Sequence, residues 1–217
     1  PNTKWKKNNL VRGWVVGETL ITGIGQGYTQ TTPLQLCMMT AQIANGGFAV
    51  KPKIIVDSNP ISYEDAKQSM ESGLLFDTDS EELLDKKLFK NQKNIKIVQE
   101  AMFASTNERF GTSYKSRIDD PKYQFAGKTG TAQVKRISKR ERELDLELEQ
   151  IPYKDRDHAL YVAYGPYVNP RYALSIIVEH GGSGSKAAAP IAKKLFKLII
   201  DRHDLRNKQS NFERITV

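Results

Sequence analysis

The chain has 217 residues, of which 39% are hydrophobic and 27% charged, which suits one domain, or most of one, with a real core and a large solvated surface. Its formal net charge of +8 suits polyanionic surroundings such as nucleic acid, acidic lipids or cell-wall polymers, and suits plain solubility equally well. The single cysteine, Cys37, excludes an internal disulfide and a multi-thiol metal site. The histidines lack the spacing of metal ligands, and no apolar run approaches the roughly 20 residues of a membrane-spanning helix.

The N-terminal part of the chain combines a polar segment, a glycine-rich segment and a helix. Residues 1–12 are polar and basic and predict a loop or a flexible arm, whereas residues 23–32 are dense in glycine and threonine and predict a loop. A helix is expected to begin at Pro33, because Thr32 can cap it and Gln35 completes a Thr-x-x-Gln capping box. It should end at the following Asn-Gly-Gly run, and its apolar face should consist of Leu36, Met39 and Ile43.

The middle of the chain holds a second helix between less regular segments. Residues 48–56 predict an extended segment interrupted by Pro52, and residues 57–94 are polar and punctuated by turn signals. Residues 94–104 predict a helix whose apolar face consists of Ile95, Val98 and Met102. Residues 105–122 predict a loop.

The last part of the chain predicts three strands and a closing helix. Residues 125–134 predict a strand, and residues 159–164 and 172–178 predict an antiparallel hairpin that turns at an Asn-Pro pair. Between them, the highly charged residues 135–157 predict a solvated insertion, within which helical and strand periods compete. A flexible glycine-rich loop follows at residues 181–184. The closing helix should begin at Pro190, with an apolar face formed by Ile191, Leu195 and Leu198.

The order of these elements predicts the fold class. Helices come first and last, and the three strands lie together between them. We therefore expect a protein of the α/β or α+β class, in which an antiparallel sheet is covered by helices and the whole of residues 1–217 belongs to one domain.

One triplet within the first predicted strand, Lys128, Thr129 and Gly130, has the residue types of a site for a peptide carboxylate. The lysine supplies a fixed positive charge, and the threonine supplies a hydroxyl that can donate to a carboxylate. The glycine lacks a Cβ, so that a peptide strand can lie against this edge. The N–H of Thr131 can then point at a developing oxyanion, where one donor contributes about 3 kcal/mol. Taken alone, the triplet favours an ordinary strand with an exposed lysine, because so short a motif often matches by chance.

Three segments that together span nearly the whole chain are more specific. The first is Ile-Thr-Gly-Ile-Gly-Gln-Gly-Tyr at 21–28 with Thr-Pro-Leu-Gln at 32–35, and the second is Gly-Lys-Thr-Gly-Thr-Ala-Gln at 127–133. The third runs from Ala-Tyr-Gly-Pro-Tyr at 163–167 through Asn-Pro at 169–170 and Glu-His-Gly-Gly-Ser-Gly at 179–184 to Ala-Ala-Pro-Ile-Ala at 188–192. In these segments the chain resembles class B penicillin-binding proteins, in particular the elongation-specific type called penicillin-binding protein 2.

The resemblance implies the penicillin-binding transpeptidase fold, with this chain as the C-terminal portion of the domain, and the activity of a serine D,D-transpeptidase. Such an enzyme acylates its serine with the D-Ala-D-Ala end of a peptidoglycan stem peptide and passes the acyl group to an amine, and β-lactam antibiotics mimic the donor. Site roles also follow from the resemblance. Lys128 and Thr129 hold the donor carboxylate beside Gly130, and Thr131 lends its backbone N–H to the oxyanion hole.

The resemblance further implies where the protein works and with what. It implies no cofactor and no metal. It implies the periplasmic face of the bacterial inner membrane, with an N-terminal anchoring helix outside this sequence, and membrane proteins of the elongation complex as partners.

The nucleophile motif of the family, S-x-x-K, and its S-x-N or S-x-D motif are expected ahead of these segments. Two short matches inside the chain, Ser183–Lys186 and Ser105–Asn107, stand in the wrong place in the chain order. We therefore expect the chain alone to lack transpeptidase and penicillin-acylation activity and to need the missing N-terminal half of the domain. Without that half it should expose apolar surface, for example around residues 160–164.

Two further classes of function can be compared with this reading of the sequence. The same fold also serves as a non-catalytic β-lactam sensor or as a scaffold module of cell-wall assembly. An S-x-x-K motif upstream of this sequence would argue against such a role for this chain. Nucleic-acid binding through the basic residues of the insertion is disfavoured, because acidic residues follow at once and no aromatic residues interleave for stacking. The basic residues concerned are Lys135, Arg136, Lys139, Arg140 and Arg142.

Overall fold

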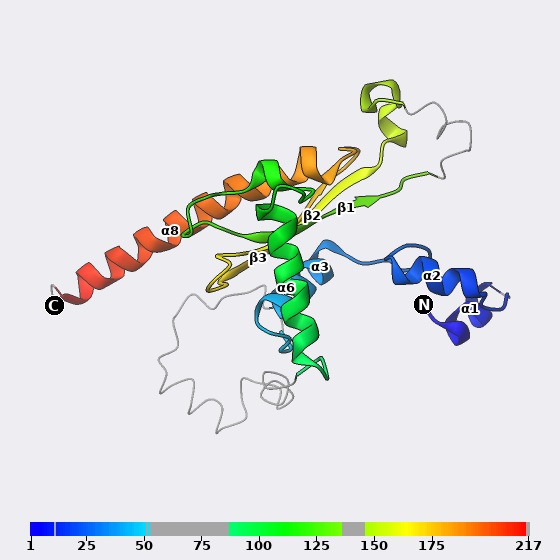
Figure 1. Cartoon of the computed structure of the whole chain (residues 1–217), viewed down its shortest axis with the longest axis horizontal. Coiled ribbons are helices and arrows are strands. Elements are labelled where there is room, and N and C mark those ends of the chain that lie inside the picture. Colours follow the sequence, from blue (N-terminus) through cyan, green and yellow to red (C-terminus); the bar gives the residue numbers. More distant parts are fainter. Residues whose placement is uncertain (11, 51, 53–86, 136–145, 216–217) are drawn as a thin grey trace.

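The computed structural model describes residues 1–10, 12–50, 52, 87–135 and 146–215, with side chains up to Arg206. At its centre lies an antiparallel sheet in the order β1-β2-β3, formed by β1 (Ala126–Ala132), β2 (His158–Gly165) and β3 (Tyr172–Val178) (Figure 1). The three expected strands and their hairpin are confirmed. Most of the expected polar stretch before the second helix and the middle of the charged insertion lie outside the described residues.

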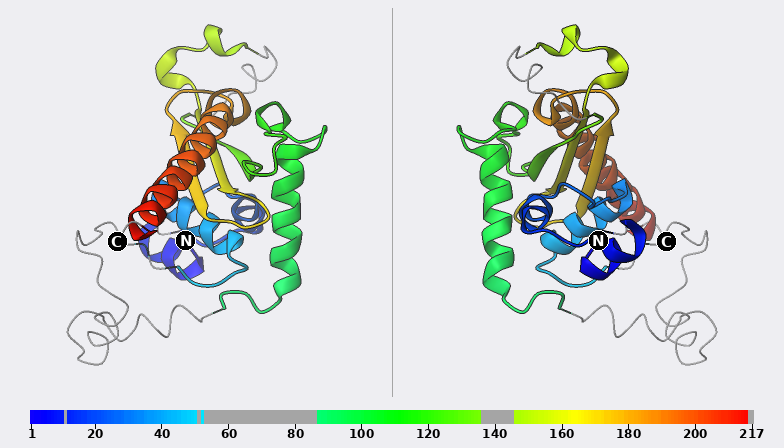
Figure 2. Two further views of the ribbon diagram at one scale, coloured as in Figure 1. Left: turned by 90° about the vertical axis from the view of Figure 1, so that its left-hand side faces the viewer. Right: turned by 90° about the vertical axis from the view of Figure 1, so that its right-hand side faces the viewer.

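Helices lie around the sheet and before it: α1 (Thr3–Leu10), α2 (Val16–Gly23), α3 (Pro33–Ala44), α6 (Gln92–Asn107) and α8 (Ala189–Ile215). Single turns complete the fold: η1 (Tyr114–Ser116), η2 (Leu148–Gln150), η3 (Tyr153–Asp155) and the π-helical turn η4 (Gly184–Ala188) that leads into α8. Figure 2 shows α8 on one face of the sheet, α3 on the other, and α6 beside the β1 edge. No helix in the described part of the chain is both long and apolar enough to span a membrane.

The start of α3 follows the predicted capping box. The Thr32 Oγ1 accepts a hydrogen bond from the Gln35 N–H at 3.2 Å, and the Gln35 Oε1 accepts one from the Thr32 N–H at 2.8 Å. Pro33 occupies the first helical position, where no amide hydrogen is needed. The helix ends at the expected Asn-Gly-Gly run, where both glycines have positive φ angles.

The predicted apolar faces of α3 and α6 are each wrong at one residue. Met39 and Val98 are 43% and 40% exposed, respectively, although both were expected on the buried face. Threonines take buried places instead, namely Thr40 in α3 and Thr106 in α6. A threonine can be buried in a helix because its hydroxyl bonds within the helix, as Thr40 does to the Leu36 carbonyl at 2.8 Å.

The two faces of the sheet carry two separate cores. On one face, Tyr161 and Ala163 of β2 pack with Phe125 and with residues of α8. On the other face, Tyr164 packs with Met102 of α6. Side chains of successive strand residues point to opposite faces, so both faces of β2 are covered. The expected exposure of residues 160–164 is therefore wrong at Tyr161, Ala163 and Tyr164, which are at most 1% exposed.

The apolar face of α8 also differs from the predicted one. Ala192, Phe196 and Ile200 are fully buried, whereas Ile191 and Leu198 are 39% and 66% exposed. Apolar residues occur on more than one side of this helix, so its sequence pattern does not single out one face. The sheet makes the choice, because Phe196 stacks on Phe125 at 4.9 Å between ring centroids.

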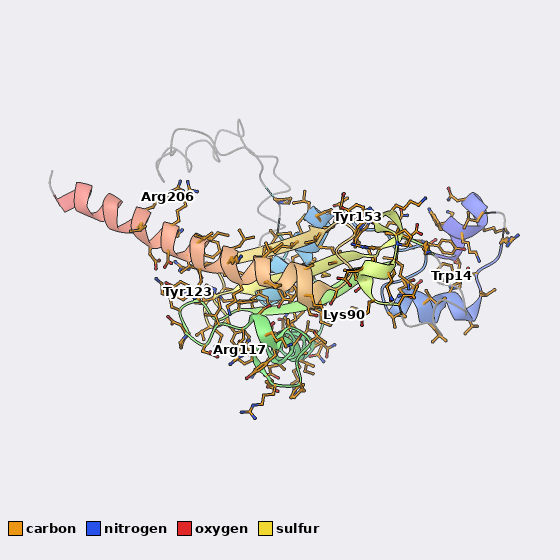
Figure 3. The ribbon with its side chains drawn as sticks, turned by 90° about the horizontal axis from the view of Figure 1, so that it is seen from above. Trp14, Lys90, Arg117, Tyr123, Tyr153 and Arg206 are labelled. Carbon is orange, nitrogen blue, oxygen red and sulfur yellow. The ribbon has the colours of Figure 1, made fainter. Side chains whose placement is uncertain are left out.

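The N-terminal residues form helices rather than the expected flexible arm. α1 and α2 lie to one side of the sheet (Figure 1), and the side chain of Lys6 is buried between them. The Lys6 Nζ donates to the Gly13 carbonyl and to the Glu18 carboxylate. The hydrogen bond to the carboxylate lowers the pKa of Glu18. Trp14, labelled in Figure 3, donates from Nε1 to the Thr19 Oγ1 at 2.9 Å. Val16, Leu20 and Ile24, in and just after α2, are strongly exposed, unlike Tyr161, Ala163 and Tyr164 of β2.

Candidate functional site

The outer edge of β1 is the surface on which the predicted site residues lie. β1 is the outer strand of the sheet, since β2 is the strand that pairs with it among the described residues. Two carbonyls, that of Phe125 just before β1 and that of Thr129 within it, point away from β2: the Phe125 oxygen accepts from the Asn107 Nδ2, and the Thr129 oxygen accepts from the Lys128 Nζ, both at 2.9 Å. Backbone groups alternate between the two sides of a strand, so the N–H of Thr131 lies on this outer edge as well.

Lys128 and Thr129 present a charge and a hydroxyl next to each other. The Lys128 side chain is exposed, and its Nζ lies 2.9 Å from the Thr129 carbonyl oxygen and 3.4 Å from the Thr129 Oγ1. An ammonium and a hydroxyl so placed can bind a carboxylate by charge-assisted hydrogen bonds. The outward N–H of Thr131 lies two residues further along the same edge, where it can donate to a carbonyl oxygen of the same ligand.

The glycine of the triplet has room on its Cβ side. A Cβ at Gly130 would lie 3.4 Å from the Leu160 Cβ, an ordinary contact, so the chain itself does not require glycine there. Gly184 is different, because a Cβ there would lie 2.4 Å from the Leu160 oxygen and 2.8 Å from the Gly130 oxygen. The glycine-rich loop, expected only to be flexible, therefore closes directly onto β1 and β2 at the triplet.

A group of hydroxyls beside β1 was missed in the sequence. Thr112 Oγ1 lies 3.1 Å from the Thr129 Oγ1, and Tyr161 Oη lies 2.9 Å from the Thr106 Oγ1 and 3.0 Å from the Ser113 Oγ. Burial raises the pKa of Tyr161, so this hydroxyl stays protonated and neutral. The signal was present in the Ser- and Thr-rich segment after α6, but only the tertiary structure brings that segment to the strand.

The two short motif matches rejected in the sequence have other contacts here. The Asn107 Nδ2 donates to the carbonyls of Phe103 and Phe125, so this amide ties α6 to β1. The Ser183 Oγ lies 3.0 Å from the Ser185 Oγ, on the turn that begins η4. Neither contact is that of a nucleophile with its base.

A cavity of about 610 Å³ lies between the insertion and the glycine-rich loop. Leu146, Leu148 and Ile151 form apolar parts of its wall, and Lys186 and Asp157 form charged parts. Its lining does not include residues 128–131, so the cavity adjoins the glycine-rich loop rather than the Lys-Thr-Gly triplet. Within the described ranges, no three His, Cys, Asp or Glu side chains gather as metal ligands.

Comparisons with known proteins agree with this fold. The family model described as "Penicillin binding protein transpeptidase domain" matches residues 3–197. Among curated relatives, peptidoglycan D,D-transpeptidase MrdA of Haemophilus influenzae is 31% identical over 93% of this chain and 29% of its own length. The MrdA protein of Acinetobacter baumannii is 32% identical over 88% of this chain and 26% of its own length. The chain thus spans less than a third of the length of these relatives.

Solved structures of similar proteins include PBP2 of Pseudomonas aeruginosa in complex with WCK 5153, with a TM-score of 0.67 and 33% identity over 91% of this chain and 37% of that one. PBP2 of Helicobacter pylori, solved in complex with MreC, has a TM-score of 0.65 and 33% identity over 91% of this chain and 31% of that one. These likenesses confirm the fold and the family expected from the sequence. With a family model that covers most of its length, the chain belongs to the penicillin-binding protein transpeptidase domain family.

Proposed function

We propose that this chain is the C-terminal portion of the transpeptidase domain of a peptidoglycan D,D-transpeptidase, an enzyme that cross-links stem peptides and is acylated by β-lactams. The observation that carries the proposal is the outer edge of β1. There the ammonium of Lys128, the hydroxyl of Thr129 and the outward N–H of Thr131 lie along one strand. The names of the MrdA relatives support the same reaction.

The proposed chemistry begins with a donor peptide lying along this edge. Its terminal carboxylate meets Lys128 and Thr129, and Gly130 adds no side chain beside it. The carbonyl of the penultimate D-Ala then lies by the Thr131 N–H. A serine hydroxyl adds to this carbonyl and loses its proton to a base. The carbonyl oxygen becomes negatively charged, and the Thr131 N–H stabilises this charge by a hydrogen bond. Collapse of this intermediate breaks the peptide C–N bond and releases protonated D-Ala. An acceptor amine then attacks the resulting ester and forms the cross-linking amide bond. The ester C–O bond breaks, and a proton lost by the amine returns through the base to the serine oxygen.

The serine and its base are proposed to come from residues outside this sequence. Ser183 is directed to Ser185, and Asn107 is committed to holding β1, so neither short match has the contacts of a nucleophile site. The residues of this chain therefore bind the donor and stabilise charge, and the chain by itself is not acylated. No cofactor or metal takes part in the proposed reaction.

The proposed setting is the periplasmic face of the bacterial inner membrane, with an anchoring helix outside this sequence. Proteins of the elongation complex are proposed as partners. The complex of H. pylori PBP2 with MreC supports a partner of this kind. The peptidoglycan stem peptide and β-lactams are the proposed ligands, and nucleic acid is not among them.

Labelled penicillin tests the proposal on the full-length protein. We expect covalent labelling of the wild type and none of the isolated chain of 217 residues. Lys128→Ala should lower the second-order acylation rate constant by about 10- to 100-fold, because a hydrogen bond to a charged group contributes about 1.5–3 kcal/mol. A matched control is Lys194→Ala, at an exposed lysine of α8. Unlabelled wild-type protein would exclude both the enzyme and a β-lactam sensor that acylates, and acylation without cross-linking activity would favour the sensor.

A further inference from the structure

The loop that follows α6 is clamped onto the end of that helix. The N–H and the Oγ of Ser113 both donate to the Ser105 carbonyl, at 3.1 and 3.0 Å. A Cβ at Gly111 would lie 2.3 Å from this same carbonyl oxygen, so only glycine lets the chain turn this closely. Thr112 lies between these two clamped residues, and its backbone is therefore held at one place beside β1.

Thr112 links this loop to the Lys-Thr-Gly triplet. Its Oγ1 lies 3.1 Å from the Thr129 Oγ1 and 3.3 Å from the Ser105 Oγ. The three hydroxyls thus form a row that runs from the end of α6 to the outer edge of β1. This row lies near the surface, where a ligand on that edge can reach its Thr129 end.

Buried atoms below the row keep its spacing. Tyr161 Oη lies 2.9 Å from the Thr106 Oγ1 and 3.0 Å from the Ser113 Oγ. Thr106 belongs to α6, Ser113 to the loop and Tyr161 to β2, so this second cluster ties all three elements together beneath β1. The place of Thr112 relative to Thr129 therefore does not depend on the Thr112 hydroxyl itself.

A bound carboxylate determines which hydroxyl of the row donates and which accepts in each hydrogen bond. An ionised carboxylate can only accept hydrogen bonds, so the Thr129 hydroxyl must donate to it. The Thr129 Oγ1 is then free to accept, and two donors face it: the Thr112 hydroxyl and, at 3.4 Å, the Lys128 Nζ. The Thr112 oxygen can accept from the Ser105 hydroxyl in turn. In such a row each hydrogen bond polarises the next one.

We propose that Thr112 is a positioning residue of the donor site: its hydroxyl donates to the Thr129 oxygen and so directs the Thr129 hydrogen at the donor carboxylate. The inference rests on the proposed function, because it needs a carboxylate at Thr129. Thr112 does not touch the donor and acts through Thr129. Ser105 supports it from the far end of the row.

The test measures acylation of the full-length protein by labelled penicillin. Thr112→Val keeps the shape of the side chain and removes the hydroxyl, and it should lower the second-order acylation rate constant by about three- to ten-fold, the effect of losing one hydrogen bond. Thr112→Ser restores the hydroxyl and should return the rate constant to within about two-fold of the wild type. Thr31→Val removes an exposed hydroxyl ahead of α3 and serves as the matched control.

A double-mutant cycle separates positioning from general damage. If Thr112 acts through Thr129, Thr112→Val should have no further effect once Thr129→Val has removed the acceptor. Melting temperatures of all variants are measured in parallel. Should Thr112→Val fail to fold, Ser105→Ala is put through the same cycle, with an expected decrease of about two-fold that vanishes in the Thr129→Val background.

The outcomes separate this inference from the proposed function. An unchanged rate constant in Thr112→Val, no rescue by Thr112→Ser, or a full additional decrease in the Thr129→Val background would each overturn the positioning role. In all three cases a labelled wild type leaves the proposed function standing. If the wild type itself is not labelled, the proposed function fails, and the inference fails with it.

Discussion

At the scale of single residues, two glycines in one strand have different reasons for being glycine. A Cβ at Gly127 would lie 2.4 Å from the Tyr161 Oη, whereas a Cβ at Gly130 makes an ordinary contact of 3.4 Å with Leu160. Gly127 is thus needed by the buried tyrosine of this chain, and Gly130 is available to the proposed ligand. The sequence motif alone does not distinguish the two.

Substitution of these glycines should separate stability from activity. Gly127→Ala should lower the free energy of unfolding by about 1–3 kcal/mol, because Tyr161 must leave its two hydroxyl partners or the strand must shift. Tyr161→Phe in the same chain removes the clashing oxygen and should recover part of the loss. Gly130→Ala should slow penicillin acylation while it leaves stability nearly unchanged. Denaturant unfolding and acylation rates of the full-length variants check this, and equal stability losses at the two glycines would contradict it.

At the scale of elements, the closing helix shows how packing selects among apolar positions. α8 carries apolar residues on several sides, and the face against the sheet is that of Ala192, Phe196 and Ile200. The alanines allow close approach of the helix to the sheet, and Phe196 fills the space against Phe125. The predicted face through Leu198 has no comparable contact with the core.

Alanine substitutions in α8 should report this choice directly. Phe196→Ala removes a fully buried ring and should cost about 3–5 kcal/mol of unfolding free energy. Leu198→Ala, at a side chain that is 66% exposed, should cost within about 0.5 kcal/mol. Denaturant unfolding of the full-length protein measures both. A larger loss at Leu198 than at Phe196 would mean that the helix is turned the other way.

At the scale of the whole molecule, a polar cluster joins segments that are far apart in the chain. Tyr123 and Lys122, in the loop before β1, bond to Asp201 of α8, and Tyr123 is labelled beside α8 in Figure 3. Lys122 also pairs with Asp204 at 3.0 Å, and Arg171 of the hairpin turn lies 3.8 Å from the same carboxylate. The cluster holds α8 against the loop and the hairpin at their exposed side.

This cluster should make the contact sensitive to acid. The hydrogen bond from Tyr123, followed by that from Lys122, lowers the pKa of Asp201, and the hydrogen bond from Lys122 lowers that of Asp204, both from an ordinary value of 3.8. A lowered carboxyl pKa contributes stability that is present above the ordinary value and is lost as the pH falls through the lowered one. We expect this contribution to decrease as the pH falls below about 3.8. Its size should be modest, because the ion pairs lie at the surface.

Two variants test the acid prediction. Lys122→Ala should bring the carboxyl pKa of Asp204 back toward its ordinary value, which NMR titration of the side-chain carboxyl measures. It should also reduce the loss of stability as the pH falls below about 3.8. Lys194→Ala, at an exposed lysine of α8, should leave both unchanged. Unaltered titration of Asp204 in Lys122→Ala would refute the assigned cause.

The sequence by itself determined the local features of this protein. Segments rich in Tyr, Val and Ile with an Asn-Pro turn between them predicted the hairpin of β2 and β3. The Thr-Pro-x-Gln pattern predicted the start of α3, and the motif segments predicted the family. Each of these depends on neighbours in the chain, because capping, strand propensity and motif chemistry involve residues a few positions apart. They therefore hold without knowledge of the tertiary contacts.

Only the tertiary structure decided which surfaces are buried and which side chains meet at the site. Packing selected the buried faces of α3, α6 and α8 and buried Lys6 between the first two helices. The fold also brought Thr112 into contact with Thr129, which is distant from it in the sequence. A helical period with apolar residues on several sides has no unique inner face, and a hydroxyl has no preferred partner until the fold brings one within about 3 Å.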